Sequence, residues 1–463
     1  MSAPEQFQAI VIGSGQGGNP LCAALAGAGL RTALVEREHI GGTCVNVGCS
    51  PTKTMVASAR VAYLARRGAD YGVRTGNISI DLERVRQRKR DIVEIFRGRN
   101  QEYLGKMANL EIIFGEARFT SPKTVCVRLK DGTERTLSAE KLFINAGARP
   151  SVPPLDGLKN VPFLSSTTVM ELAEVPQHLL VLGGGYVGLE FGQMFCRFGS
   201  RVTIVQAGAH LLTNEDADVV DEVASILRQD GVEILLNTRG TSVSRSGAQI
   251  HLTVRSGNES RVLEGSHLLI ATGRTPNSDT LNLPAAGVAI DSRGFITVNA
   301  KLETNVPGIY AMGDINGGPA FTHISYDDFR ILRANIIRKG SASTTGRLVP
   351  YTVYVDPQLG RIGLTETEAI AQKKNIRVAR MPMTFVARAE ENDETRGFMK
   401  AIVDADTDQI LGAAVLGAEG GEIMSMLELA IMGKLPFTAL RDGIFAHPTF
   451  AESLNNLFNH FDS

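Results

Sequence analysis

Residues 8–36 read QAIVIGSGQGGNPLCAALAGAGLRTALVE, and this stretch decides the fold. An apolar run predicts a strand, the glycines predict a tight turn, and an Ala- and Leu-rich segment to about Ala28 predicts a helix. A second apolar run ends at Glu36. Such a turn lets the backbone approach a pyrophosphate at the helix N-terminus, and the acid suits the hydroxyls of an adenosine ribose. We therefore expect a Rossmann-like dinucleotide site containing Gly13, Ser14, Gly15, Gly18 and Glu36.

A second copy of this unit begins at His178. It runs through LLVLGGGYVGLE and a helix to about Phe198, and its second strand, RVTIVQ, ends at Gln206. In each copy 23 positions separate the first glycine from the end of the second strand (36 − 13 and 206 − 183). This internal repeat predicts two dinucleotide sites. The second is expected to contain Gly183, Gly185, Gly188 and Gln206.

Gln206 leaves the choice between NAD and NADP open. A carboxylate at this position selects NAD by binding the ribose 2′-hydroxyl, whereas nearby arginines accommodate the 2′-phosphate of NADP. Gln206 is neutral, and Ala207–Asp218 contains neither Lys nor Arg.

The rest of the chain divides at turn-rich segments. FINAGARP (143–150) and LIATGRTP (269–276) each read as a strand that runs into a glycine turn, where one domain passes to the next. Four strand-like runs (TVYV, RIGLT, FMKAIVD and ILGAAVLG) and a helix over 422–432 indicate a C-terminal α+β domain, and 81–109 reads as a long exposed helix. We expect an α/β fold in four segments: two Rossmann-like domains (1–150 and 151–276), a central domain (277–346) and the C-terminal domain (347–463).

Composition excludes several classes of protein. Lys and Arg number 48 against 49 Asp and Glu, so the net charge of -1 gives no basic field for nucleic acid or an anionic membrane. No apolar stretch reaches the ~18 residues of a membrane span, and no signal peptide is visible, so we expect a cytoplasmic protein. The five cysteines are too few for a disulfide scaffold. Three of them, Cys22, Cys126 and Cys196, read as packing residues.

The other two cysteines, Cys44 and Cys49, lie in GGTCVNVGCSPTK. Five positions of a regular helix rise about 7.5 Å, too far for a disulfide, so a bond between them needs a distorted turn, which Gly42, Gly48 and Pro51 favour. The pair could also be two unrelated buried thiols or part of a metal site, although no second Cys/His cluster completes one. Its position beside a nucleotide fold favours a redox-active pair.

His447 lies in AHPTFAE, with Glu452 five residues later. A lone histidine is usually an ordinary surface or core residue. Here a carboxylate is available to orient the ring, which makes a general acid/base pair a second reading.

These motifs together resemble the flavoprotein disulfide reductases, the class I pyridine nucleotide-disulfide oxidoreductases that include dihydrolipoamide dehydrogenase, glutathione reductase and mercuric reductase. The resemblance covers nearly the whole chain through GSGQGG, Glu36, GGTCVNVGC-SPTK, GGGYVGLE, ATGRTPN, YAMGDI and HPTFAE. It implies that 1–150 binds FAD, 151–276 binds NAD(P), 277–346 completes the FAD site and 347–463 forms a homodimer interface.

The resemblance also implies an electron relay. Hydride from NAD(P)H reaches FAD, and two electrons then pass to a Cys44–Cys49 disulfide, with Cys49 facing the flavin and Cys44 attacking the substrate. His447, supported by Glu452, reaches the disulfide of the other subunit, so the homodimer is obligatory for catalysis. Lys53 lies near the flavin and pairs with Glu190. Further cofactor contacts are expected at Gly42, Thr43, Lys53, Ala117, Gly147, Gly273 and Asp314.

The resemblance narrows the substrate only in part. Mercuric reductases carry an extra C-terminal cysteine pair and usually replace the histidine, whereas this sequence ends in LFNHFDS and keeps His447, which disfavours mercury. FTHISYDDFR and ENDETRGFMKAIVD resemble the mercuric-reductase-like branch that includes the reactive-chlorine-resistance flavoproteins, which implies copper(II) or hypothiocyanous acid as substrates. We expect a small disulfide, an oxidised sulfur species or a metal ion as substrate, and no resident metal. A dihydrolipoamide dehydrogenase and a non-catalytic soft-metal-binding thiol protein are the alternatives. Two departures from the family pattern are Asn145, where Thr is common, and Ser50, where an aliphatic residue is usual.

Overall fold

The computed structural model describes residues 3–462 and divides into two compact units. The first unit contains the residues up to Thr54, Arg84–Ser151 and Gly273–Arg347, and the second contains Met55–Glu83, Val152–Thr272 and the residues from Leu348 onward. The first unit therefore unites the first and third of the four expected segments, and most of the second unit comes from the other two. The domain boundaries within each unit stay a prediction.

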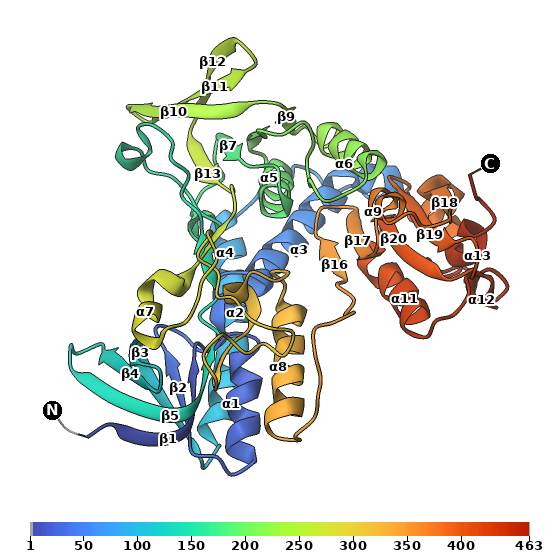
Figure 1. The fold of residues 1–463 in the computed structure, drawn as a ribbon. Helices are drawn as coiled ribbons and strands as arrows, with labels where there is room; N and C mark the ends of the chain where they lie inside the picture. The colour runs from blue at the N-terminus through green and yellow to red at the C-terminus, as the bar shows by residue number, and fades with distance from the viewer. Residues whose placement is uncertain (1–2, 463) are drawn as a thin grey trace. The chain divides into compact units, whose positions relative to one another are not determined.

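The first unit is built on a parallel sheet with the strand order β3-β2-β1-β5-β15, in which β4 pairs antiparallel with the extended ends of β3 and β5 (Figure 1). β6 and β14 form a separate two-stranded antiparallel sheet. The strands are β1 (Glu5–Ile12), β2 (Thr32–Glu36), β3 (Leu110–Ser121), β4 (Thr124–Leu129), β5 (Glu134–Ile144), β6 (Ala148–Pro150), β14 (Arg274–Pro276) and β15 (Ile309–Ala311).

Both faces of this sheet are buried. Ala9 and Val11 of β1 face a core formed with α1 (Gly18–Gly27) and α8 (Thr322–Ile336), whereas Ile10 and Ile12 face a core that includes α7 (Leu283–Ala286). Successive side chains of a strand point to opposite faces, so burial of every residue from Ala9 to Ile12 requires cover on both sides. The other helices that begin or end in this unit are α2 (Gly42–Asn46), α3 (Cys49–Arg66) and α4 (Leu82–Gly105).

The second unit repeats the Rossmann-like arrangement in its own parallel sheet, with the strand order β13-β7-β8-β9. The strands are β7 (His178–Leu182), β8 (Arg201–Val205), β9 (Glu233–Leu235) and β13 (His267–Ile270), and the helices are α5 (Tyr186–Phe198) and α6 (Ala217–Gln229). A three-stranded antiparallel sheet packs beside them and contains β10 (Arg239–Ser246), β11 (Gln249–Ser256) and β12 (Glu259–Gly265). Both predicted βαβ units are thus confirmed.

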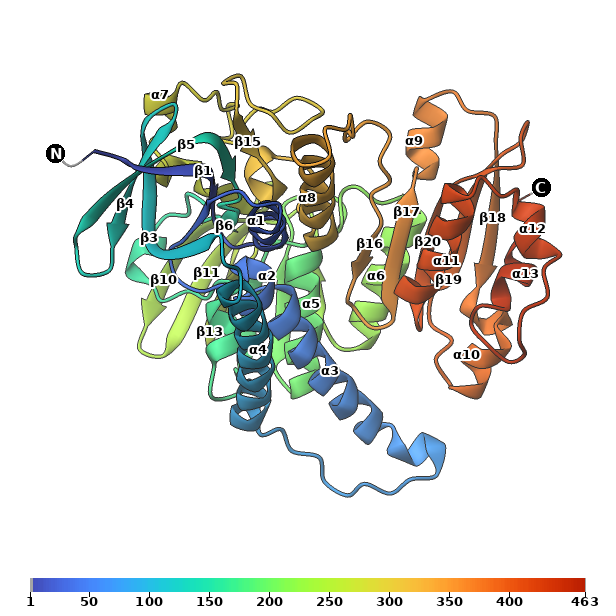
Figure 2. The same ribbon diagram turned by 90° about the horizontal axis from the view of Figure 1, so that it is seen from below.

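The C-terminal part of the second unit is a five-stranded antiparallel sheet covered by helices (Figure 2). The strand order is β16 (Tyr351–Val353), β17 (Gln358–Gly363), β20 (Ile410–Gly417), β19 (Phe398–Asp404) and β18 (Ile376–Pro382). The helices of this part are α9 (Glu366–Ala371), α10 (Ala387–Glu391), α11 (Gly420–Met432), α12 (Phe437–Arg441) and α13 (Ser453–Leu457). The predicted α+β domain is confirmed. Its edge strand β18 was not anticipated, because arginines interrupt the apolar residues of IRVARMP.

A polar cluster around the buried Lys400 joins the C-terminal sheet to the start of α6. Lys400 of β19 is almost fully buried and lies 3.2 Å from Asp216, 3.1 Å from Asp218 and 2.7 Å from Glu366. Although burial raises the pKa of the Asp216 carboxyl, the backbone N–H groups of Thr367 and Glu366 that donate to it hold that pKa below its ordinary value. The acidic residues after Gln206 therefore connect two parts of the second unit.

No helix among residues 3–462 is long and apolar enough to cross a bilayer.

Candidate active site

The first glycine loop is held against the ends of three neighbouring strands. The Gly13 N–H donates to the Val35 carbonyl at 2.8 Å, and its φ of +97° is one that glycine adopts without strain. A Cβ at Gly13 would lie 2.4 Å from the Asn145 carbonyl oxygen, and a Cβ at Gly18 would lie 2.1 Å from the Gly13 carbonyl oxygen. The loop therefore packs so tightly that side chains are excluded, as in loops whose backbone approaches a pyrophosphate at a helix N-terminus.

The second glycine loop reproduces these contacts. The Gly183 N–H donates to the Val205 carbonyl at 2.9 Å, and φ is +117°. A Cβ at Gly183 would lie 2.4 Å from the Ala271 carbonyl oxygen, and a Cβ at Gly188 would lie 2.1 Å from the Gly183 carbonyl oxygen. A Cβ at Gly185 would meet no protein atom within 4 Å among the described residues, so open space lies in front of this glycine. The sequence repeat is therefore also a repeat of atomic contacts.

Glu36 and Gln206 occupy equivalent positions in the two loops. The Glu36 carboxylate accepts the Ser14 N–H at 2.9 Å and the Ser14 hydroxyl at 2.6 Å. The Gln206 side-chain oxygen accepts the Gly184 N–H at 3.0 Å, and its amide nitrogen donates to the His210 carbonyl at 3.0 Å. Gln206 thus makes the loop contact that an acid makes in the first copy, but it carries no charge.

Asn145 connects three elements around the first loop. Its side-chain oxygen accepts the Gly18 N–H at 3.0 Å, and its amide nitrogen donates to the Met312 carbonyl at 2.8 Å and lies 3.4 Å from the Ser325 hydroxyl. The side chain is buried. The amide, which has a donor and an acceptor, bridges the start of α1 to the end of β15 and to α8.

Asp314 lies in the short 3-10 turn Gly313–Asn316 that follows β15. Burial raises the pKa of its carboxyl, which Arg274 opposes from 3.6 Å. The Gly313 N–H donates at 2.8 Å to Asp328, a fully buried carboxylate that also pairs with Arg347 at 2.6 Å. Asp328 therefore fixes the turn that carries Asp314. Sequence reasoning predicted Asp314 but missed Asp328, because no local pattern shows that the Asp328 side chain reaches this turn.

The two cysteines lie at a break between two helices. Cys44 is in α2, which ends at Asn46, and Cys49 is the first residue of α3. A Cβ at Gly48 would lie 2.8 Å from the Thr43 carbonyl oxygen, so glycine lets the two helices meet closely. A Cβ at Gly42, whose φ is +62°, would lie 2.6 Å from Gly15 Cα. The cysteine segment is therefore distorted, as the spacing predicts, and it packs directly on the first dinucleotide loop.

The environments of the two sulfur atoms differ. Both thiols are unbonded, and the Cys49 Sγ lies 3.2 Å from the hydroxyl of Thr322, the first residue of the 15-residue helix α8. A hydrogen bond to the Cys49 sulfur, reinforced by burial, raises the pKa of the Cys44 thiol. A thiolate is therefore disfavoured at Cys44. The N-terminal end of α8 lies beside Cys49, and such a helix end favours negative charge.

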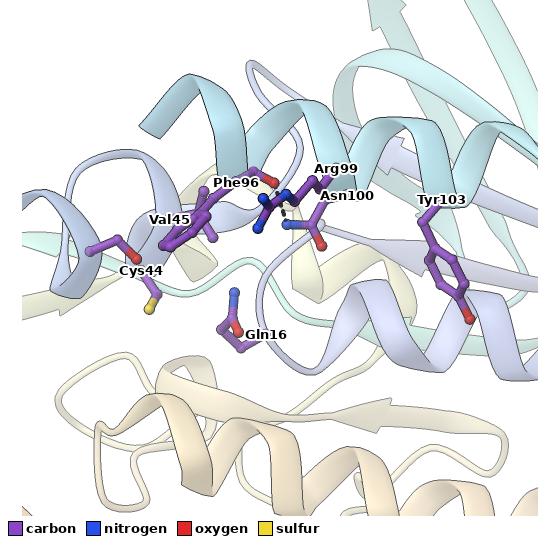
Figure 3. Close-up of a pocket in the computed structure, with 8 residues that line it drawn as sticks. Gln16, Cys44, Val45, Phe96, Arg99, Asn100 and Tyr103 are labelled. Carbon is purple, nitrogen blue, oxygen red and sulfur yellow. Dashed lines mark hydrogen bonds between the residues drawn. The ribbon is translucent and has the colours of Figure 1, made fainter. Parts of the chain in front are cut away.

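A cavity of about 390 Å³ opens beside Cys44 (Figure 3). The glycine loop, the cysteine segment and α4 contribute its walls. It is lined by Gln16, Cys44, Val45, Ser50, Phe96, Arg99, Asn100 and Tyr103. Tyr103 and Cys44 lie at opposite ends of the group in Figure 3. Sequence reasoning identified Cys44 and singled out Ser50 but missed the α4 residues, because they are 52 or more positions away (96 − 44).

His447 and Glu452 form the expected pair in the second unit. The imidazole Nδ1 lies 2.8 Å from one carboxylate oxygen of Glu452 and 3.1 Å from the other. The histidine side chain is 66% exposed, so its other ring nitrogen is accessible. The carboxylate orients the ring and selects which nitrogen remains available for proton transfer.

Comparison with known proteins decides the family. The family profile described as pyridine nucleotide-disulphide oxidoreductase matches residues 7–328, and the dimerisation domain of the same family matches residues 349–458. The chain belongs to the pyridine nucleotide-disulphide oxidoreductase family.

Individual members of this family are similar over most of their length. The chain is 40% identical over 458 residues to the probable pyridine nucleotide-disulfide oxidoreductase RclA of Escherichia coli K12, covering 98% of this chain and 99% of that protein. It is 35% identical to a mercuric reductase of Shewanella putrefaciens, covering 96% and 79%. The structure of a Cu(II) complex of the HOCl-induced flavoprotein disulfide reductase RclA from Escherichia coli superposes with a TM-score of 0.90 at 39% identity, covering 98% and 99%.

Pyridine nucleotide-disulphide oxidoreductases bind FAD and use NAD(P)H, and the residues present here fit FAD. The tight loop around Gly13 and the acid Glu36 suit a pyrophosphate and a ribose. The buried side-chain oxygen of Asn19 makes no hydrogen bond among the described residues, and neither does the Arg274 Nε, which lies 3.6 Å from Asp314, so both atoms leave hydrogen-bonding capacity for a ligand. The chain also carries the dimerisation domain of the family.

The remaining predicted site residues lie on several helices, strands and turns. Lys53 is in the first two turns of α3, Glu190 is in α5 and accepts the Tyr354 N–H at 2.9 Å, and Ala117 is buried in β3. Thr43 lies in α2, and Gly147 and Gly273 adopt positive φ angles after β5 and β13. The pairing of Lys53 with Glu190 stays a prediction.

Proposed function

We propose that the chain is an NAD(P)H-dependent flavoprotein disulfide reductase in which Cys44 and Cys49 are the redox-active pair. The observation that carries the proposal is the asymmetry of this pair. Cys49, the first residue of α3, is exposed and contacts Thr322 at the start of α8, whereas Cys44 is half-buried and borders a cavity. Electrons received at one sulfur can therefore leave through the other. The proposed acceptor is a small disulfide, an oxidised sulfur species or a metal ion.

The chain's own residues hold the cofactors. Bound FAD supplies a two-electron carrier between NAD(P)H and the cysteine pair. We assign its pyrophosphate and ribose to the first glycine loop and Glu36, and further contacts to Gly42, Thr43, Ala117, Gly147, Gly273 and Asp314. The nicotinamide cofactor is assigned to Gly183, Gly185, Gly188 and Gln206. Lys53, supported by Glu190, completes the flavin side of the site.

Proton transfer limits what Cys44 can do alone. Because Cys44 keeps its proton in the reduced pair, attack on a substrate requires a base. We propose that His447 of a second subunit removes this proton through Nε2, while Glu452 holds Nδ1. The Cys44 thiolate attacks the substrate, and Cys49 then attacks the Cys44 sulfur to release the product and form the disulfide. This assignment makes a homodimer obligatory for catalysis. The cycle needs a supply of NAD(P)H. We therefore propose that the protein is cytoplasmic.

Steady-state and spectroscopic measurements test the proposal. The purified protein should contain FAD and oxidise NADH or NADPH when offered lipoamide, glutathione disulfide, Hg(II), Cu(II) or hypothiocyanous acid, one at a time. Reduction should produce a long-wavelength absorbance from a Cys49 thiolate beside the bound flavin. Cys44→Ser should retain this absorbance and Cys49→Ser should lose it. Equal effects of the matched substitutions would contradict the assigned roles, and rapid NAD reduction by dihydrolipoamide would favour a dihydrolipoamide dehydrogenase.

Copper(II) is a specific second acceptor to examine, because the RclA structure noted above is a Cu(II) complex. Among residues 3–462 no group of three or more His, Cys, Asp or Glu side chains could hold a metal ion. If copper is reduced, we therefore propose that it binds transiently, as a substrate, to the thiols of Cys44 and Cys49. Loss of copper reduction in both cysteine variants is the expected result.

A further inference from the structure

The cavity beside Cys44 has an unbalanced charge. Of its eight lining residues, Arg99 is the only one that is charged at neutral pH unless a thiol ionises, and no lining residue carries a carboxylate. Arg99 is solvent-exposed and forms no ion pair within residues 3–462. Figure 3 shows its guanidinium turned from α4 toward the space that Cys44 and Gln16 also border. A cation without a partner at the entrance to a nucleophile favours anions.

The other polar side chains of the cavity are partly engaged. The Asn100 amide nitrogen donates to the Phe96 carbonyl at 2.8 Å, and the Gln16 amide nitrogen donates to the Gly41 carbonyl at 3.3 Å. Neither residue can supply a charge, and Arg97, two positions from Arg99, is already bound to Asn46 at 2.8 Å. Arg99 is therefore the side chain that can distinguish substrates by charge.

We propose that Arg99 is a specificity-determining residue that makes the cavity select small electrophilic sulfur compounds with a negative charge near the reacting bond. This inference rests on the proposed function of Cys44 and names the substrate class that it would take. For a disulfide RSSR, the Cys44 thiolate forms a mixed disulfide and releases one RS⁻, and Cys49 then displaces the second RS⁻ as the Cys44–Cys49 disulfide forms. Two electrons from NAD(P)H restore the dithiol, so that NAD(P)H, RSSR and H⁺ give NAD(P)⁺ and two RSH.

A charge series of otherwise similar disulfides tests the proposal. The holoenzyme is assayed with 3,3′-dithiodipropionate (a dianion), 2-hydroxyethyl disulfide (neutral) and cystamine (a dication) at low ionic strength. We expect kcat/KM to fall in that order. Arg99→Gln should lower kcat/KM for the dianion by about three- to five-fold, the upper part of the range of a single exposed ion pair, and should leave the neutral disulfide within two-fold. Arg99→Glu should reverse the order of the two charged substrates.

A control substitution separates local recognition from net charge. Arg128 is on β4, is 62% exposed and pairs with Glu116, so Arg128→Gln makes the same change of charge in the same unit. It should leave the order of the three substrates unchanged. If Arg128→Gln and Arg99→Gln have the same effect, or if cystamine is the best substrate of the wild type, the proposal is overturned.

Alkylation of Cys44 gives a readout that does not depend on turnover. The chemically reduced holoenzyme is treated with iodoacetate, an anion, or iodoacetamide, its neutral counterpart, and modification of Cys44 is followed by tandem mass spectrometry. We expect Arg99→Gln to lower the iodoacetate-to-iodoacetamide rate ratio about five-fold, and an unchanged ratio overturns the role of Arg99. If neither these three disulfides nor the acceptors named under the proposed function support NAD(P)H oxidation, the proposed function fails, but the alkylation ratio still decides whether Arg99 attracts anions.

Discussion

The charge of the side chain at position 206, which is zero for Gln206, should set the preference between NADH and NADPH. In the first loop the equivalent residue, Glu36, accepts the Ser14 N–H at 2.9 Å, and in the second Gln206 accepts the Gly184 N–H at 3.0 Å. Gln206→Glu keeps this hydrogen bond and adds a negative charge at the position where an adenosine ribose binds. The substitution therefore changes the electrostatics of the site with little change in shape.

The size of the effect follows from Coulomb's law. A carboxylate and a doubly charged 2′-phosphate about 5 Å apart repel by roughly 2 to 3 kcal/mol when the effective dielectric constant is about 40 to 80. This energy corresponds to a loss of roughly 30- to 150-fold in kcat/KM for NADPH. NADH lacks the phosphate, and its ribose hydroxyls can donate to the new carboxylate, so its kcat/KM should stay within about three-fold of the wild-type value or rise.

Steady-state kinetics with both nucleotides and one fixed disulfide measures the effect. We expect the wild type to use NADH and NADPH with kcat/KM values within about ten-fold of each other, because it has neither the acid nor the arginines that discriminate between them. Gln229 on α6 is exposed, so Gln229→Glu is a matched control that should leave the ratio unchanged. A NADPH-to-NADH ratio in Gln206→Glu within three-fold of the wild-type ratio would refute the assignment of this residue to the nicotinamide cofactor.

Three further substitutions test other parts of the structure. Lys400→Met leaves the buried Asp216 carboxylate without its cation, so chemical denaturation should show a loss of about 3 to 5 kcal/mol in the free energy of unfolding. Because the pKa of Cys44 is raised, its thiolate forms only at higher pH unless a base removes the proton. His447→Gln removes the proposed base and should therefore shift the pH profile of kcat/KM for a neutral disulfide to higher pH. Asn145→Ala removes two buried hydrogen bonds, so the holoenzyme should lose about 2 kcal/mol in its free energy of unfolding and release FAD at lower denaturant concentration.

Repetition is what made the fold predictable from the sequence. The common offset of 23 residues identified both glycine loops, and each loop makes the same backbone contacts to its neighbouring strands. The cysteine segment was equally informative, because a bond between cysteines five positions apart needs a break in the helix, and such a break occurs between Asn46 and Cys49. These features are local, since the residues that define them lie close together in the chain.

Contacts between distant segments could not be predicted in this way. Asp328 supports the turn of Asp314 from another element, and Arg99 reaches the cavity of Cys44 from a helix 55 positions later in the chain (99 − 44). Arg99 belongs to no motif, and Asp328 lies in FTHISYDDFR, a segment that carries the family resemblance but does not show which of its residues reaches Asp314. Asn145 was noticed only as a departure from a family pattern, and the structure supplies the reason for an amide there, which is its ability to donate and accept at once.

The direction of electron flow through the cysteine pair follows from what each sulfur contacts. The Cys49 Sγ lies 3.2 Å from the hydroxyl of Thr322, the first residue of α8. The positive end of this helix favours negative charge nearby. Cys44 is kept protonated by the same pair and lies beside the cavity with Arg99. The reduced pair is therefore stable until a base removes the proton from Cys44. A substrate that brings negative charge to Arg99 and a second subunit that brings His447 would both be needed at the same sulfur. Under the proposed function, the exposed His447–Glu452 pair and Arg99, which forms no ion pair within residues 3–462, both act on a site that a second subunit and the substrate complete.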